Sequence, residues 1–250
     1  MYSNKKRQAI LLALLAAHCT FYGTNVMAAP VPVTDGKYTA DGTDTYDPIT
    51  HTDTINSIKV SNGAQVSVTA GATTVNGVNS SESLTASSGG QLTVNGSLNT
   101  TVGLGDTYST GVGYSRIVAN GSGSKIILSG TDNSITSKST NYKNSESAFF
   151  AYNNGEIHVT GDTTTVKVSQ SRIVAAQDGA SITFSNGKSD DQSALFKAAS
   201  SSQRWMVVAN GTGRINFDRV EIDGTGYSNG RMFLANGDPA KDINEQAKIT

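Results

Sequence analysis

The chain has 250 residues, with 19 lysines and arginines, 20 aspartates and glutamates, and a formal net charge of −1. This balance argues against a chain that binds nucleic acid or an anionic membrane surface. The single cysteine, Cys19, excludes a disulfide framework, so packing alone must stabilise an exported form.

Residues 1–28 have the pattern of a secretory signal peptide. Basic residues at positions 5–7 precede an apolar run over 9–17, and small residues follow it. Cleavage after Ala28 is preferred to cleavage after Ala29, which would place a proline first in the mature chain. We expect the leader to direct export through the inner membrane and to be removed.

The mature chain would keep 16 basic and 20 acidic residues, a net charge of −4, and no cysteine. The absence of cysteine suits a chain that must cross a second membrane before it folds. Residues 29–54 hold three of the four prolines and no clean repeat. We interpret them as a leading segment or an N-terminal cap, which repeat proteins need at an exposed end.

A repeating unit dominates the chain from about residue 55. An apolar pair at i and i+2 leads through a Gly-bearing turn, six or seven residues on, into a second such pair. Apolar residues with this spacing share one face of a strand. The first pairs are Ile58/Val60, Leu84/Ala86, Ile117/Ala119, Phe149/Ala151, Ile173/Ala175, Val207/Ala209 and Phe233/Ala235. The second pairs are Val66/Val68, Leu92/Val94, Ile126/Leu128, Ile157/Val159, Ile182/Phe184 and Ile215/Phe217.

Self-similarity at a period of roughly 20–50 residues is typical of solenoids. A β-sandwich or barrel built from hairpins is the alternative. The string Ser-Arg-Ile-Val-Ala occurs at 115–119 and again at 171–175. Like residues stack in ladders in a parallel coil, so this repetition favours one. We therefore predict an all-β fold, a right-handed parallel β-helix over residues 55–250. Its last unit lacks a second pair, so we expect the chain to be incomplete at its C-terminus.

These features together resemble a known family. The leader, the cysteine-free chain rich in Ser, Thr, Gly and Asn, and repeats such as Arg-Ile-Val-Ala-Asn-Gly-Ser-Gly-Ser-Lys-Ile-Ile-Leu (116–128) are similar to the passenger region of bacterial autotransporters of the type V secretion pathway. The resemblance covers residues 55–237 and is one of composition and architecture. It implies surface display or secretion after passage through the periplasm, aided by an outer-membrane β-barrel translocator if the full chain has one.

The resemblance also implies a role in adhesion or host-surface interaction. The partner would be a host-surface protein or glycan, or a second copy of the chain. Two alternatives remain: a β-helical polysaccharide-acting enzyme, and a structural stalk that displays another domain.

No catalytic residue, cofactor or metal site is predicted. The Gly-Asp-Ser-Gly segment of trypsin-like proteases is missing, and we interpret His51 with Asp53, and His158 alone, as solvated surface residues. Acidic clusters of the kind used by polysaccharide-acting β-helices are approached only by Asp190–Asp191 and by Asp218, Glu221 and Asp223. The aspartates that could gather a calcium ion are Asp35, Asp41, Asp44 and Asp47. We interpret both sets as solvated charges.

The candidate binding residues lie on the expected first strand of each unit. An apolar stripe would be formed by Val118, Phe150, Val174, Val208 and Leu234. It is either a ligand or self-association surface, or core beneath an inter-unit loop, and we favour the covered alternative. The basic residues Arg116, Arg172, Arg204 and Arg231 precede unit starts and would contact anionic glycans or simply end the strands. Hydrogen-bonded ladders at the turns are predicted for Asn120, Asn154, Asn210 and Asn236.

Overall fold

A computed structural model describes residues 28–50, 55–76, 83–103, 117–138, 147–168, 172–186, 193–200, 205–227, 231–241 and 246–250. Every regular secondary-structure element within these ranges is a β-strand. These ranges contain no helix long and apolar enough to cross a membrane. Several residues considered above lie outside the described ranges: the leader through residue 27, His51, Asp53, Arg116, Asp190, Asp191 and Arg204.

Three sheets surround one core. The nine-stranded sheet contains β1 (Val33–Thr34), β2 (Lys37–Asp41), β3 (Ser57–Ser61), β6 (Leu84–Ser87), β9 (Ile117–Asn120), β12 (Ser147–Tyr152), β15 (Arg172–Gln177), β18 (Val207–Gly211) and β21 (Phe233–Gly237). The seven-stranded sheet contains β4 (Gln65–Val68), β7 (Gln91–Val94), β10 (Lys125–Leu128), β13 (Glu156–Thr160), β16 (Ser181–Ser185), β19 (Arg214–Asp218) and β22 (Lys248–Ile249). The six-stranded sheet contains β5 (Ala72–Asn76), β8 (Ser97–Gly103), β11 (Asp132–Lys138), β14 (Thr163–Val168), β17 (Ala194–Ser200) and β20 (Val220–Tyr227).

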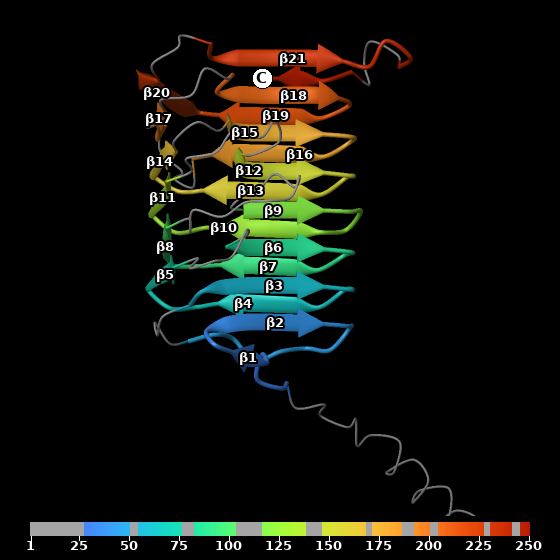
Figure 1. Ribbon diagram of the computed structural model, residues 1–250, viewed down its shortest axis with the longest axis vertical. Coiled ribbons are helices and arrows are strands. Elements are labelled where there is room, and N and C mark those ends of the chain that lie inside the picture. The colour runs from blue at the N-terminus through green and yellow to red at the C-terminus, as the bar shows by residue number, and fades with distance from the viewer. Residues whose placement is uncertain are drawn as a thin grey trace, which may run out of the picture.

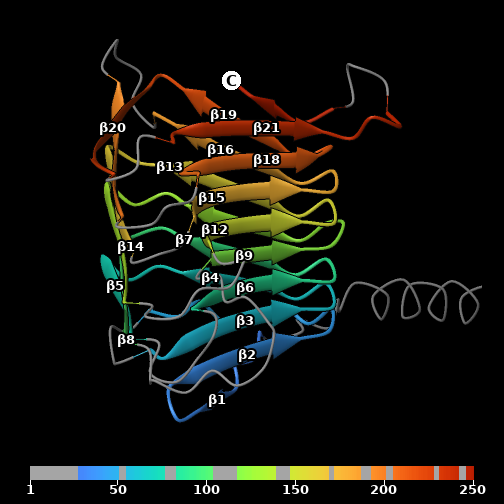
Figure 2. The same ribbon diagram turned by 45° about the horizontal axis from the view of Figure 1, so that its top comes forward.

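The chain visits the three sheets in turn, so that one strand from each makes a rung. Figure 1 shows the rungs stacked from the blue N-terminal end to the red C-terminal end, with the six-stranded sheet along the left side. Figure 2 shows the nine-stranded sheet in front of the seven-stranded one. All strand pairs in the described residues are parallel except β1 with β2. A sandwich of antiparallel sheets is therefore wrong, and the long parallel sheets are consistent with a β-helix.

The second apolar pairs stack as the sequence predicts. Val66 lies opposite Leu92, which lies opposite Ile126, and the register continues through the remaining pairs. These residues are buried up to Ile215, while the last one, Phe217, is half-buried. Their intervening residues point outward. The local period of two therefore decides the face of the strands that carry these pairs.

Tight turns join the nine-stranded sheet to the seven-stranded one. In the first of these turns Asn62 and Gly63 have φ angles of 53° and 84°, and Ala64 N donates to Ser61 O at 3.1 Å. Two consecutive positive φ angles define a type I′ turn, which Asn and Gly favour. Further turns of this kind occur at Ser88–Gly89, Asn153–Asn154 and Asp178–Gly179.

One of the predicted first pairs, Ile173/Ala175, is wrong by one residue. The register places Val174 and Ala176, rather than Ile173 and Ala175, opposite Phe149 and Ala151. The turn explains the shift, because Ala176 is six residues before Ile182, the usual separation. All four residues from 173 to 176 are apolar and buried. Hydropathy alone therefore does not show which of them face the core. Ile117 and Ile173, which hold the same place in the two repeated strings, therefore lie one residue out of register with each other.

The six-stranded sheet occupies the segments that vary in length between repeats. Its inward columns mix apolar with polar residues: Val75 and Ile135 are joined there by Thr100 and Asn133, each at most 2% exposed. The hydroxyl of Thr100 has no hydrogen-bond partner among the described residues. Because a buried polar position interrupts the apolar alternation, the sequence pattern did not indicate this third strand.

The parallel ladder also begins before residue 55. Strand β2 lies in register with β3, so that Tyr38 and Ala40 continue the columns of Ile58 and Val60. Strand β1 turns back on β2 through Asp35 and Gly36, both with positive φ. Part of the segment 29–54 therefore has the same strand pairing as the repeats, and the β1–β2 hairpin lies at the end of its sheet.

The core becomes aromatic toward the C-terminal rungs. The ring of Phe184 lies 5.3 Å from that of Phe149, 4.9 Å from that of Phe196 and 5.1 Å from that of Phe217, measured between centroids. These contacts join all three sheets across the interior. Aromatic pairs at such distances add to the stabilisation gained by burial.

Candidate binding surfaces

The predicted apolar stripe is largely covered. Val118 and Val208 are 2% and 1% exposed on the outer face of the nine-stranded sheet. Phe150 and Leu234, also outward, are half-buried. Val174 is fully buried on the inner face, and Ala175 takes its place in the outer column. These positions agree with the covered alternative, and the correction for Val174 follows from the register shift of β15.

An aromatic pair includes Phe150, one of the half-buried members of this outer column. The rings of Phe150 and Tyr152 stack at 4.8 Å with an interplanar angle of 19°. They are two residues apart on β12, so both project from the same side of the strand. Both are half-buried, which limits the area that a ligand could contact there.

Of the four arginines predicted to precede unit starts, Arg172 and Arg231 lie in the described ranges, the first at the start of a strand and the second two residues before one. Arg172 begins β15 opposite Ser147 and is half-buried. Arg231 is exposed, and its carbonyl oxygen accepts a hydrogen bond from Met206 N. The described residues therefore do not form a continuous basic row.

The predicted cleavage site lies where the described chain begins. Ala29 N lies 3.2 Å from Thr45 O, and its carbonyl accepts from Asp47 N at 2.8 Å. Ala28 is half-buried and precedes these bonds. The first residue of the expected mature chain is thus already held against the first rung.

Side chains at the turns form partial ladders. Asn153 Nδ2 donates to Asn120 Oδ1 at 3.1 Å. At the N-terminal end, Ser61 Oγ and Asn62 Nδ2 donate to Asp41 Oδ1 at 2.8 and 2.7 Å. These bonds lower the pKa of Asp41 below its ordinary value. Asn210 and Asn236 share the column of Asn120, whereas Asn154 occupies a turn position with a φ angle of 64°.

A charged cluster lies on the outer face of the seven-stranded sheet. Glu156 Oε2 is 3.2 Å from Lys125 Nζ and 3.2 Å from His158 Nε2. Burial raises the pKa of Glu156, but the hydrogen bonds from His158 and Lys125 and their charges outweigh this effect and leave it below the ordinary value. All three side chains keep a third or more of their surface exposed, so the cluster is a solvated network.

A small cleft opens on the outer face of the six-stranded sheet. Its volume is about 190 Å³, and a β-bulge forms it where the register between β17 and β20 shifts after Lys197. The bulge gives β20 one more residue than β17 between the flanking pairs. Ala198, Ala199 and Gly226 are among its lining residues. Bulges of this kind re-aim side chains and often accompany functional sites.

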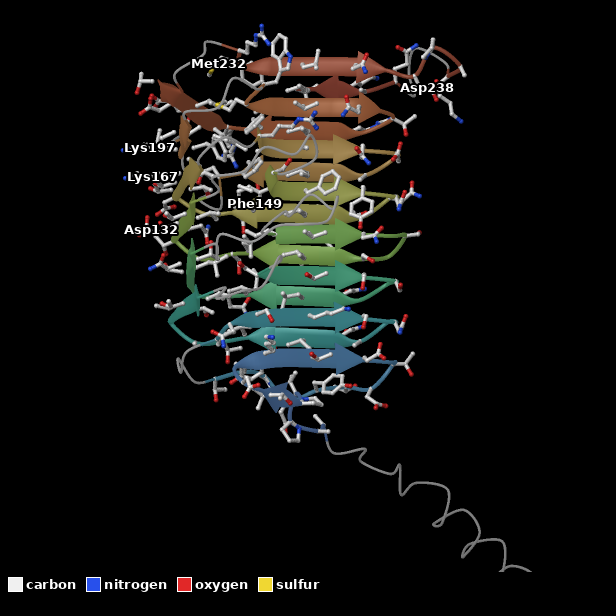
Figure 3. The ribbon with its side chains drawn as sticks, in the orientation of Figure 1. Asp132, Phe149, Lys167, Lys197, Met232 and Asp238 are labelled. Atoms are coloured by element: carbon white, nitrogen blue, oxygen red, sulfur yellow. The ribbon has the colours of Figure 1, made fainter. Side chains whose placement is uncertain are left out.

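Polar side chains surround the cleft. Lys167, Lys197 and Asp223 line it together with Thr165 and Thr225. Figure 3 shows Lys167 and Lys197 one above the other, both projecting from the side of the six-stranded sheet. Asp223 Oδ1 accepts from Thr225 N at 3.0 Å and from Thr225 Oγ1 at 2.7 Å. These bonds, with a smaller effect of the Lys197 charge, lower the pKa of Asp223.

Sequence reasoning missed this cleft. Asp223 was considered only as part of an acidic set with Asp218 and Glu221, and the structure separates that set. Asp218 belongs to β19 in the seven-stranded sheet, whereas the other two lie on β20. The two glycines in Asp-Gly-Thr-Gly at 223–226 were the available signal, because glycine within a strand often marks a bulge.

An apolar hollow of about 460 Å³ lies at the C-terminal end of the stack. Phe217, Ile222, Phe233 and Ile249 are among its lining residues, and Phe233 is 42% exposed. Among the described residues, no group of three His, Cys, Asp or Glu side chains is placed to hold a metal ion.

No family model, curated protein or solved structure matches the chain. Nothing in these comparisons or in the described residues indicates an enzyme. The stacked sheets, their outer faces and the leader pattern are therefore the features that point to a function.

Proposed function

We propose that the chain is the passenger part of an autotransporter-like protein, a right-handed parallel β-helix that is exported and displayed or released at the cell surface for adhesion. The observation that carries the proposal is the parallel stacking of strands in all three sheets, in register apart from the bulge between β17 and β20. Connections between parallel strands of one sheet are right-handed in about 98% of cases, which supports that handedness here.

The leader and the composition support export. A basic segment followed by an apolar run is the pattern of a cleavable signal peptide, and no cysteine follows residue 19. A solenoid whose repeats contact mainly their neighbours can fold progressively from one end. Such a fold suits a chain that must emerge unfolded through a second membrane.

Adhesion is supported by what the outer faces offer. Each outward column presents one side chain per rung, and successive rungs are about 4.8 Å apart. The columns therefore form an extended surface rather than one deep pocket. The proposed partners are a host-surface protein or glycan, with self-association as a second mode. A purely structural stalk would share the architecture but would bind nothing.

Export is tested by expressing the chain with its leader in a Gram-negative host and analysing cell fractions. The mature N-terminus should be Ala29, and the chain should leave the cytoplasm. The variant Leu14→Arg, with a charge in the apolar run, should stay in the cytoplasm, whereas Ser3→Arg should be exported normally. Cytoplasmic retention of the unaltered chain would contradict the proposal.

Adhesion is tested separately with the purified chain on cultured epithelial cells and on extracellular matrix. Saturable binding is expected. An exported chain that binds neither surface would contradict adhesion and favour the stalk. New reducing ends after incubation with polysaccharides would instead favour the enzyme.

A further inference from the structure

We propose that the cleft at the bulge between β17 and β20 binds one sugar ring of an uncharged glycan. The proposal rests on the proposed adhesive function only in one respect, namely that the chain meets such a glycan at a cell surface. Binding itself can be measured on the purified chain.

The shape of the cleft fits a fragment the size of one ring. Its volume of about 190 Å³ is smaller than the roughly 300–1,000 Å³ of pockets for drug-sized ligands. The outward methyl group of Ala199 gives it an apolar surface suited to the C–H face of a sugar. Gly226 keeps the wall open, because a Cβ at this position would lie 2.8 Å from Ala199 Cβ.

The polar groups match hydroxyl pairs. Both hydrogen bonds of Asp223 involve Oδ1, so Oδ2 has none from any described residue. No described residue forms an ion pair within 4.0 Å of Lys167 or Lys197. A carboxylate oxygen can accept from one sugar hydroxyl while an ammonium donates to its neighbour, and charge-assisted hydrogen bonds are the stronger ones.

The balance of charge favours an uncharged ligand. Glu221 lies on the same outward face of β20 as Asp223, so two acidic groups accompany the two lysines. A strongly anionic glycan would meet no net positive field here. A small zwitterion could pair with these charges, but exposed ion pairs contribute little to affinity.

A polymer would gain from contacts outside the cleft. The outward column that contains Lys197 and Asp223 continues down the sheet through Thr165, Ser134, Asn99 and Thr74. All of these side chains are exposed or half-exposed. A glycan lying along this column would meet a polar group at each rung, and linked weak contacts raise overall affinity.

The test measures binding of a fluorescent neutral mannohexaose and of a heparin-derived hexasaccharide to the purified chain by polarisation. We expect the neutral hexaose to bind with little salt dependence. Ala199→Leu fills the cleft and should weaken this binding by about tenfold or more. Thr136→Leu is the matched control, since Thr136 occupies the same outward column two strands away and is equally half-buried.

A second pair of variants tests the charged groups. Lys197→Met should weaken binding of the neutral hexaose, and Lys59→Met, on the nine-stranded sheet, should not. Circular dichroism and melting of each variant show whether it folds. Binding of heparin alone with a steep salt dependence, equal binding by the Ala199→Leu and Thr136→Leu chains, or no glycan binding at all would each overturn the proposal.

The two proposals fail in different ways. Adhesion to cells that survives the Ala199→Leu change would overturn the sugar subsite and keep the adhesive function. Binding of the neutral hexaose by a chain that attaches to no cell or matrix would keep the subsite and overturn the adhesive function.

Discussion

Asn153 donates a hydrogen bond from Nδ2 to Oδ1 of Asn120, which lies 33 residues earlier in the chain and one rung below, at 3.1 Å. Asn153 has a φ angle of 52°, and asparagine is among the few residues that adopt such a conformation readily. The same residue therefore makes the turn and ties it to the preceding rung.

This bond should couple the two turns in stability. Asn120→Ala and Asn153→Gly each remove one partner of the bond, and glycine at position 153 still accepts a positive φ angle. Each variant should lower the free energy of unfolding by about 0.5–1.5 kcal/mol. Urea denaturation of the single and double variants gives the coupling. A double variant equal to the sum of the singles would show that the bond contributes nothing.

Close stacking at one corner predicts a large effect of a small change. A Cβ on Gly130 would overlap the carbonyl of Gly96 in the rung below. Gly130→Ala should therefore destabilise the chain by about 1–3 kcal/mol or more, because backbone must shift to admit the methyl group. Gly71→Ala is the control, since a Cβ there meets nothing within 4 Å. Equal melting temperatures for both variants would contradict the close stacking.

The aromatic core should depend on Phe184. Its ring touches those of Phe149, Phe196 and Phe217, so Phe184→Ala leaves a cavity bordered by all three sheets. A loss of about 3–5 kcal/mol in the free energy of unfolding is expected. Phe233→Ala should cost much less, because Phe233 is 42% exposed. Thermal or urea denaturation distinguishes the two, and a larger effect at Phe233 would be contrary to this packing.

The Glu156 cluster predicts a modest loss of stability in acid. The pKa of Glu156 is lowered from an ordinary value of 4.5, so its ionised form stabilises the folded chain above that pH. This contribution should disappear as pH falls through the lowered pKa. Because the partners are partly exposed, we expect less than about 1 kcal/mol.

The measurement is the free energy of unfolding of the wild type and of Glu156→Gln between about pH 3 and pH 6. The difference between the two chains should shrink toward the acid end. Lys125→Met should reduce the wild-type pH dependence, whereas Lys37→Met, on another sheet, should not. A difference that is constant with pH would contradict the assignment to Glu156.

The sequence alone determined the strands that follow the tight turns. In Val66-Ser-Val68 and its counterparts, the alternation of side chains is a local property of extended backbone. The Asn- and Gly-containing turns were equally readable, because few residues accept positive φ angles. Local chemistry therefore gave the all-β class and the repeat.

Only the tertiary structure decided the rest. Whether Ile173 or Val174 faces inward depends on its pairing with Phe149, since both side chains are apolar. The third strand, with Thr100 and Asn133 facing inward, depends on neighbouring rungs in the same way. The cleft arises from one extra residue between β17 and β20. Register, burial of polar groups and bulges are set by ladders between residues about 25–35 positions apart, and no local pattern contains that information.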